Sequence, residues 1–326
     1  MNPRLAFLLL ALLTGQLALQ AAPAPGNMDE TKVPPYQLPD PLIANDGTPI
    51  RDAATWRAKR RPELLELFAQ HEYGRTPAGR PAAMHWEVTS LDRAAFGGKA
   101  TRKEITIWFS EKRDGPQMHL LIYQPNEAKV PPPVFLGLNF MGNHTVSADP
   151  GIALAQPRVV YDVPRYRAAD PQPAEKPDPR GVHAEKWQIE TVVARGYATA
   201  TAWCNDLCPD RAAGLSDPAS VAALFRTGGA EERADDAWGA MGIWAWGLSR
   251  ALDYLETDRE LDAKRVAVHG FSRLGKAADW AAAQDGRFAM LVSNESGCGG
   301  AALHQRIYGE TIALINTRFP FWFAKN

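Results

Sequence analysis

From residue 133 onward, segments typical of buried strands alternate with segments typical of helices, and this order constrains the fold most. Residues 134–140 are apolar almost throughout, which suits a strand buried on both faces of a parallel sheet. Similar strand segments are expected at 197–203, 265–269 and 288–292, and helices at 185–195, 236–255 and 273–284. The alternation predicts an α/β fold with a mostly parallel sheet and helices on both faces.

Smaller elements are expected before residue 133, and two long loops after it. A helix is predicted over 55–73, where Leu64, Leu65, Leu67 and Phe68 form an apolar stripe. Three further strands are predicted over 85–91, 104–109 and 119–123, which alternate in polarity or are rich in β-branched and aromatic residues. Residues 145–182, with seven prolines, and 205–229 are predicted loops.

The helix expected over 236–255 has the clearest periodicity. Its apolar face is formed by Trp238, Met241, Ala245, Leu248, Leu252 and Leu255. We expect Gly239 and Gly242 to let this helix lie close against the sheet. Residues 300–307 are predicted to be helical, and the apolar and aromatic segment 307–323 is expected to have no partner sheet in this chain to cover it.

The N-terminus has the pattern of a secretory signal. Arg4 precedes the wholly apolar run 5–13, and small residues follow at Ala21, Ala22 and Ala24. We therefore expect a signal peptide over 1–22, a Pro-rich extended arm over 23–50 and an α/β domain over 51–326. The apolar run is too short for a spanning helix, so the mature protein is expected to be secreted or periplasmic, without membrane association.

Composition excludes several classes of partner and site. Lys and Arg total 36 and Asp and Glu total 37, with no basic block, so nucleic acid is excluded as a partner. The three cysteines are too few for a disulfide scaffold, and free buried thiols are the preferred reading. Cys204 and Cys208 are four residues apart without a His or second Cys pair nearby, which argues against zinc.

Chemistry is predicted where a strand ends at Ser272. The sequence reads Val266-Ala267-Val268-His269-Gly270-Phe271-Ser272-Arg273-Leu274-Gly275-Lys276. A serine at a sharp strand-to-helix turn is typical of a nucleophile elbow, whose helix directs backbone N–H groups at an oxyanion. The usual pattern is G-x-S-x-G, but Leu274 occupies the position of the second glycine. The alternative is that Ser272 only caps the helix.

A serine nucleophile needs a base, and the base needs an acid that orients it. Glu295 follows the strand expected at 288–292 and is the candidate acid; the alternative is a solvated loop carboxylate. His304 is the only histidine after Ser272, and we do not favour it as the base because it falls in the helix expected at 300–307. The base of an α/β hydrolase follows the last strand, so we expect the chain to stop before its last strands and helix.

With the elbow in place, the chain resembles the bacterial glucuronoyl esterases, the 4-O-methyl-glucuronoyl methylesterases. The segment 270–276 matches the G-x-S-R-x-G-K motif of that family. Further matches are Leu138-Asn139-Phe140-Met141-Gly142-Asn143-His144-Thr145, Trp244-Ala245-Trp246-Gly247-Leu248-Ser249-Arg250 and Ser296-Gly297-Cys298-Gly299-Gly300. The resemblance runs from about residue 50 to the end of the chain and implies an α/β-hydrolase fold without a cofactor or metal.

The resemblance implies a role for five residues. Ser272 is implied as the nucleophile, Arg273 as the source of oxyanion stabilisation and Glu295 as the acid used by some members. Lys276 and Glu310 match the sugar-binding residues. The catalytic histidine and a sugar-stacking tryptophan of the family fall after Asn326, and an acid one strand later than Glu295 is an open alternative.

The implied activity is hydrolysis of glucuronic acid esters that join xylan to lignin alcohols, by an exported monomer acting on a carbohydrate polymer. Two alternatives stay open: an acetyl or other carbohydrate esterase of the same fold, and a non-catalytic chain that binds sugar. Structural roles are the preferred interpretation for three further side chains, and two interpretations stay open for a fourth. His144 is expected to fix its loop, Asp206 to be solvated and Trp322 to serve in packing, while Trp203 is read as core or site wall.

Overall fold

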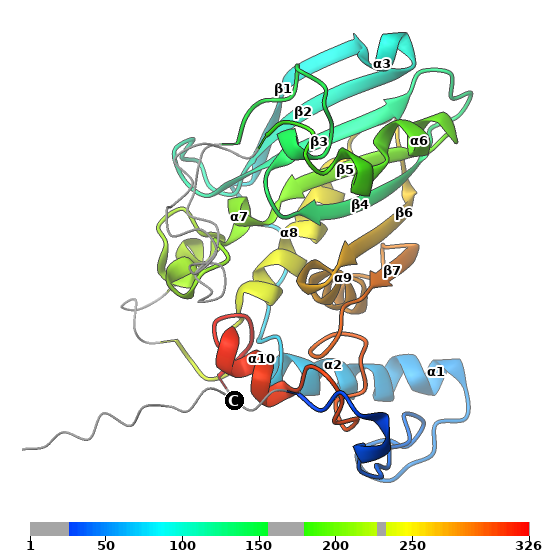
Figure 1. Cartoon of the computed structure of the whole chain (residues 1–326), viewed down its shortest axis with the longest axis vertical. Coiled ribbons are helices and arrows are strands. Elements are labelled where there is room, and N and C mark those ends of the chain that lie inside the picture. Colours follow the sequence, from blue (N-terminus) through cyan, green and yellow to red (C-terminus); the bar gives the residue numbers. More distant parts are fainter. Residues whose placement is uncertain (1–25, 156–178, 227–232, 326) are drawn as a thin grey trace, which may run out of the picture.

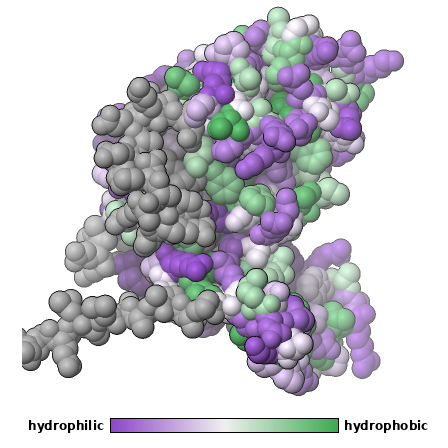
Figure 2. All heavy atoms as spheres, in the orientation of Figure 1, coloured by the Kyte–Doolittle hydropathy of each residue, from purple (hydrophilic) through white to green (hydrophobic). Residues whose placement is uncertain are grey.

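The computed structural model describes residues 26–155, 179–226 and 233–325. The expected signal peptide over 1–22 and the first residues of the expected arm lie outside this part of the chain. Within it, no helix is both long enough and apolar enough to cross a membrane. In the view of Figure 2, hydrophobic residues form small patches between hydrophilic ones.

A seven-stranded mixed sheet forms the centre of the described structure, in the order β1-β2-β3-β5-β4-β6-β7. The strands are β1 (His85–Ala94), β2 (Ala100–Trp108), β3 (Gln117–Pro125), β4 (Pro133–Asn139), β5 (Ala198–Trp203), β6 (Asp262–Phe271) and β7 (Met290–Asn294). The pairs β5–β4, β4–β6 and β6–β7 are parallel, whereas β1, β2 and β3 join by antiparallel pairing (Figure 1). The carboxyl ends of four strands therefore meet at one edge.

Helices cover both faces of the sheet. The helices of the described residues are α1 (Ala53–Thr55), α2 (Arg61–His71), α3 (Ala95–Gly98), α5 (Ala184–Trp187), α6 (Ile189–Ala194), α7 (Cys204–Leu207), α8 (Ala240–Leu255), α9 (Arg273–Gln284) and α10 (Ile312–Arg318). Of these, α8 and α9 pack on one face of the sheet and α6 on the other, whereas α1, α2 and α10 lie beyond its edge (Figure 1). Alternate residues of β3 separate two cores: Leu120 and Ile122 pack in the larger cluster with α8 and α9. Leu121 and Tyr123 pack on the other face in the smaller cluster with α6. The predicted α/β architecture is confirmed.

Several local expectations were wrong. Helix α8 is buried on every side rather than along one face. Residues 300–307 form turns rather than a helix, and the predicted loop 205–229 contains short helical turns. All three cysteines are buried and free, as predicted.

The aromatic segment 319–323, which ends the segment 307–323, is covered within the chain by the core and α8 rather than by a sheet. Phe319, Phe321, Trp322 and Phe323 are buried in the main core. The carbonyl groups of Phe321 and Trp322 accept hydrogen bonds from the first two N–H groups of α8, at 3.0 and 3.1 Å. These N–H groups have no partner within the helix, so the segment caps α8. A Cβ on Gly239 would lie 2.1 Å from the Trp322 carbonyl oxygen, so this glycine allows close approach to the segment rather than to the sheet.

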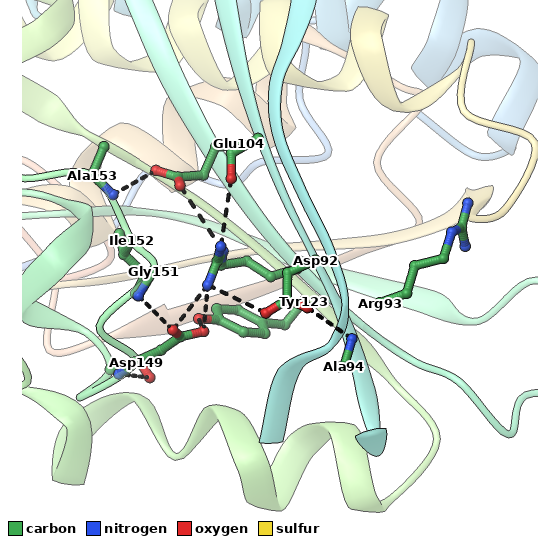
Figure 3. A network of polar contacts seen from close by, with 12 residues as sticks. Asp92, Arg93, Ala94, Glu104, Tyr123, Asp149, Gly151, Ile152 and Ala153 are labelled. Carbon is green, nitrogen blue, oxygen red and sulfur yellow. Dashed lines mark hydrogen bonds and ion pairs between the residues drawn. The ribbon is translucent and has the colours of Figure 1, made fainter. Parts of the chain in front are cut away.

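A buried ionic network attaches the loop after β4 to the antiparallel strands (Figure 3). The Arg102 guanidinium on β2 donates to both carboxylate oxygens of Asp149 at 2.9 Å. The Tyr123 hydroxyl donates to the same carboxylate at 2.6 Å, and the Gly151 N–H at 2.8 Å. Burial acts to raise the pKa of Asp149, but these hydrogen bonds and the Arg102 charge outweigh it and lower the pKa.

We expect Asp149→Ala to destabilise the fold by about 2–4 kcal/mol, because it leaves the buried Arg102 charge without its bidentate partner. The matched control is Asp92→Ala, since the Asp92 carboxylate is 3.8 Å from Arg102 and 41% exposed. It should cost about 1 kcal/mol or less. Urea unfolding of the two variants measures the difference, and equal losses would contradict the assignment.

Candidate active site

The active-site turn joins β6 to α9 at Ser272. Ser272 has φ 56° and ψ −127°, a conformation that costs a non-glycine residue about 1–3 kcal/mol unless its surroundings hold it. The Ser272 N–H donates to the Asn294 carbonyl at the end of β7, at 2.9 Å. This hydrogen bond fixes the strained turn against the neighbouring parallel strand.

Two glycines make room for this turn. A Cβ on Gly270 would lie 2.0 Å from the Leu274 carbonyl oxygen, which is part of α9. A Cβ on Gly275 would lie 3.0 Å from the Ser296 Cβ and 3.2 Å from the Asn294 carbonyl oxygen. Gly275 therefore provides the close helix–strand approach. Its position explains how Leu274 can stand where the usual elbow motif has its second glycine.

The Ser272 hydroxyl does not cap the helix that follows it. Ser272 occupies the residue before α9, but its side chain makes no capping hydrogen bond with the helix. This geometry argues against the simple N-cap interpretation. Among the described residues, no histidine is hydrogen-bonded to the Ser272 hydroxyl.

The candidate acid Glu295 is placed beside the elbow by the strand pairing. It directly follows Asn294, whose carbonyl accepts the Ser272 N–H. Glu295 is exposed and has φ 48°, a left-handed conformation at the carboxyl end of β7. The strained backbone positions of Ser272 and Glu295 are thus adjacent on neighbouring strands.

Arg273 lies in a buried cluster at the start of α9. Its guanidinium is paired with the Asp210 carboxylate, and its Cζ lies 4.6 Å from the centre of the Trp322 ring. The Trp322 Nε1–H also donates to Asp210, at 2.8 Å, and Phe319 stacks on Trp322 with ring centres 3.7 Å apart. Burial raises the pKa of Asp210, opposed by the Arg273 charge and the Trp322 hydrogen bond. Trp322 therefore packs, as predicted, and also orients a charged pair.

Lys276 and Glu310 lie together, one helical turn from Ser272. The Lys276 ammonium is 3.8 Å from the Glu310 carboxylate and donates to the Ser296 carbonyl. Lys276 is buried and Glu310 is 38% exposed, so the pair has one side toward solvent. Burial lowers the pKa of Lys276, and Glu310 counteracts this effect. The spacing of Ser272 and Lys276 predicted that they would share a helix face, whereas the approach of Glu310 depends on the 295–311 loop.

Two of the other candidates have the structural roles that the sequence suggested. His144 is fully buried, and its Nδ1 accepts the Ala155 N–H at 3.3 Å, which fixes the loop after β4. Trp203 is buried and donates to the Phe140 carbonyl at 2.8 Å.

The prediction for Asp206 was wrong, because its side chain is buried rather than solvated. Its carboxylate accepts the His119 backbone N–H at 3.0 Å and lies 2.9 Å from the His119 Nδ1. It therefore ties the start of β3 to α7 at the carboxyl end of β5.

Two buried carboxylates near the site were not predicted from the sequence. Asp210 follows a short helix and is brought to Arg273 by packing alone. Glu72 ends α2, and its Oε1 is buried without a hydrogen-bond partner among the described residues. Burial raises the pKa of Glu72 to about 7, an effect that the Lys276 charge partly offsets. Only the Pro-Asp and His-Glu dipeptides mark these positions, and neither is a specific signal.

The sheet, the strained serine and the following helix together define an α/β hydrolase. The family model for "Glucuronyl esterase, fungi" matches residues 232–313. Carbohydrate esterase MZ0003, from an unknown prokaryotic organism, is 44% identical over 93% of this chain and 68% of its own length. The 4-O-methyl-glucuronoyl methylesterase of Schizophyllum commune is 26% identical over 81% of this chain and 51% of its own length.

Solved structures agree with these matches. A glucuronoyl esterase from Solibacter usitatus has a TM-score of 0.82 and 47% identity, covering 90% of this chain and 72% of the solved chain. A promiscuous CE15 esterase from a marine bacterial metagenome has a TM-score of 0.79 and 44% identity, covering 92% and 73%. The chain belongs to the glucuronoyl esterase family, carbohydrate esterase family 15, and its relatives are carboxylic ester hydrolases. The resemblance and the α/β-hydrolase fold are thereby confirmed.

We expect Gly270→Ala to destabilise the fold by about 2–4 kcal/mol, because the new Cβ would overlap the Leu274 carbonyl oxygen. Gly286→Ala is the matched control, since a Cβ there meets no atom within 4 Å. It should change stability by less than about 1 kcal/mol. Urea unfolding compares the two; a Gly270 variant as stable as the Gly286 variant would contradict the close approach.

Glu72 predicts a dependence of stability on pH. Its pKa of about 7 in the folded state lies above the usual 4.5, so the folded chain binds this proton more tightly. The stability that this bound proton contributes is therefore fully present below pH 4.5 and is lost as the pH rises through 7. We expect Glu72→Gln to be more stable than the parent by about 1–3 kcal/mol at pH 8 and nearly equal at pH 4. Urea unfolding at both pH values tests this, and a pH-independent difference would be the contrary result.

Proposed function

We propose that this chain hydrolyses esters of glucuronic acid or 4-O-methyl-glucuronic acid. The observation that carries the proposal is the Lys276–Glu310 pair one helical turn from the strained Ser272. A cation and a carboxylate beside a nucleophile suit a uronic acid, whose hydroxyl groups need both donors and acceptors. Bacterial and fungal relatives, a glucuronoyl esterase and a 4-O-methyl-glucuronoyl methylesterase, support the same substrate class.

In the proposed mechanism, the Ser272 hydroxyl attacks the ester carbonyl and the alcohol departs, which forms an acyl-enzyme. Water then hydrolyses this acyl-enzyme. The backbone N–H of Arg273 and its guanidinium stabilise the negative oxygen of each tetrahedral intermediate. Asp210 and Trp322 hold that guanidinium in place. Glu295 orients the base, and Lys276 with Glu310 binds the sugar.

We propose that the general base comes from outside residues 1–326. All seven histidines belong to the described residues, and the contacts of three show other uses. His144 fixes a loop, His119 contacts Asp206, and the His304 Nε2 accepts the Gly299 N–H at 3.3 Å.

We also propose that residues 1–22 direct export, and that the mature monomer acts on glucuronoyl esters between xylan and lignin. The charge and apolar pattern of the N-terminus supports export. A polymeric substrate requires an open site, and the exposed side of Glu310 is compatible with one.

Chemical rescue tests the nucleophile and the source of the base. With benzyl glucuronate as substrate, we expect the 326-residue chain alone to turn over slowly. Imidazole should raise its rate at least about tenfold above that of Ser272→Ala under the same conditions, because it supplies the proton acceptor. Equal rates for parent and variant at every imidazole concentration would remove Ser272 from the mechanism.

Lys276→Ala tests the substrate class. On benzyl glucuronate we expect the imidazole-supported KM to rise about tenfold, with little change on 4-nitrophenyl acetate, because only the uronate loses a contact. Lys264→Ala on the exposed part of β6 is the control and should change neither. A loss on both substrates points to unfolding, and thermal melts identify it. An unchanged KM for glucuronate in a folded variant supports an acetyl or other carbohydrate esterase instead.

A further inference from the structure

The 295–311 loop carries Glu310 but has little regular structure of its own. It runs from the end of β7 to the start of α10 and contains no helix or strand. Its glycines Gly297, Gly299 and Gly309 have positive φ, and glycine allows the unfolded chain many other conformations at such positions. Contacts with other segments are therefore needed to fix the backbone that presents Glu310.

Helix α10 fixes the loop on the carboxyl side of Glu310. Thr311 caps this helix, because its hydroxyl oxygen accepts the Leu314 N–H at 3.3 Å and its carbonyl accepts the Ile315 N–H at 2.9 Å. Leu314 and Ile315 are buried, so the helix is itself held in place. The residues just before Glu310 have no such helix and depend on contacts of another kind.

Asn27, in the N-terminal arm, holds the backbone just before Glu310. Its carbonyl accepts the Gly309 N–H at 2.7 Å, and its side-chain amide donates to the Ile307 carbonyl at 3.3 Å. The Asp29 N–H donates to the Asn27 Oδ1 at 2.9 Å, which orients the amide so that its nitrogen faces Ile307. One residue of the arm is therefore hydrogen-bonded to two residues of the loop, and 280 positions separate it from Ile307.

An ion pair and a close backbone approach add to this attachment. The Glu30 carboxylate pairs with the Arg306 guanidinium, whose Cζ lies 4.5 Å from the centre of the Tyr308 ring. A Cβ on Gly26 would lie 1.7 Å from the Gly309 carbonyl oxygen, so the arm and the loop meet backbone to backbone. The four residues before the sugar-binding carboxylate are therefore attached to the arm directly or through one another.

We propose that Asn27 is a positioning residue of the sugar site, which sets where the Glu310 carboxylate lies relative to Lys276. This inference rests on the proposed role of the Lys276–Glu310 pair in binding a uronate. Lys276 is buried and donates to the Ser296 carbonyl, so its ammonium is fixed from its own side. Its 3.8 Å distance from the Glu310 carboxylate then depends on the loop, and a displacement of about 1 Å is enough to weaken a binding site.

Kinetics with imidazole as the added base test this role in the 326-residue chain. Asn27→Asp keeps the acceptor for the Asp29 N–H and removes the donor to the Ile307 carbonyl. We expect the KM for benzyl glucuronate to rise about threefold to tenfold, with kcat on this substrate and the rate on 4-nitrophenyl acetate unchanged within about twofold. An unchanged KM, or an equal loss on both substrates, overturns the proposal.

A second pair of variants tests the arm without changing Asn27. Glu30→Ala removes the ion pair with Arg306 and should raise the same KM about twofold to fivefold, a smaller change because the pair is exposed. Lys32→Ala is the matched control, since Lys32 pairs with Asp29 inside the arm, at 3.0 Å, and should leave both substrates unaffected. Exchanging the charges, with Glu30→Arg and Arg306→Glu together, should restore the parent KM. Equal KM values for Glu30→Ala and Lys32→Ala contradict a role of the arm.

Glu310→Ala separates failure of this inference from failure of the proposed function. An unchanged KM for benzyl glucuronate in Glu310→Ala removes the sugar-binding role, and the inference with it. If Glu310→Ala raises the KM and Asn27→Asp does not, the sugar site stands and Asn27 has no part in it. In the double variant we expect no rise beyond that of Glu310→Ala alone, because Asn27 acts through this carboxylate. Additive rises would overturn its role as a positioning residue.

Discussion

The strained turn at Ser272 is the constraint on which the rest of the site depends. Its positive φ persists because the Asn294 carbonyl holds its N–H and because Gly270 and Gly275 admit the helix. This turn sets the direction in which α9 leaves β6. That direction places Arg273 against the aromatic segment and Lys276 against the 295–311 loop, so one backbone conformation positions both charges.

The sequence predicts the structural features that depend on residues close together in the chain. The elbow motif located Ser272, and helical periodicity located α9 at its observed bounds, 273–284. The existence of the strands was also predictable. However, β6 spans 262–271 rather than the predicted 265–269, because it pairs with two neighbouring strands. The surroundings of α8 were not predictable. Its tryptophans lie on more than one side of the helix. The periodicity predicts a single apolar face because it does not record how many elements pack against a helix.

The site residues that sequence reasoning missed are joined by long-range packing. Asp210 and Arg273 are 63 residues apart, and Asp210 and Trp322 are 112 apart. No spacing rule relates such positions, so only the fold reveals them. Three acids that are at least partly shielded from solvent also differ: Asp149 and Asp210 have ionic partners, whereas Glu72 Oε1 lacks a hydrogen-bond partner among the described residues. Burial alone therefore does not determine how a carboxylate is stabilised; the groups around it do.

The capping of α8 by the aromatic segment has a consequence for biosynthesis. Arg273 leaves the ribosome before Phe319 and Trp322, which follow it by 46 and 49 positions. Until those rings emerge, the Arg273–Asp210 pair lacks its cover, and the first amides of α8 lack their acceptors. The nascent chain therefore exposes apolar surface around its elbow during translation, when chaperones can bind it. The site therefore reaches its final arrangement only after Trp322 has been synthesised.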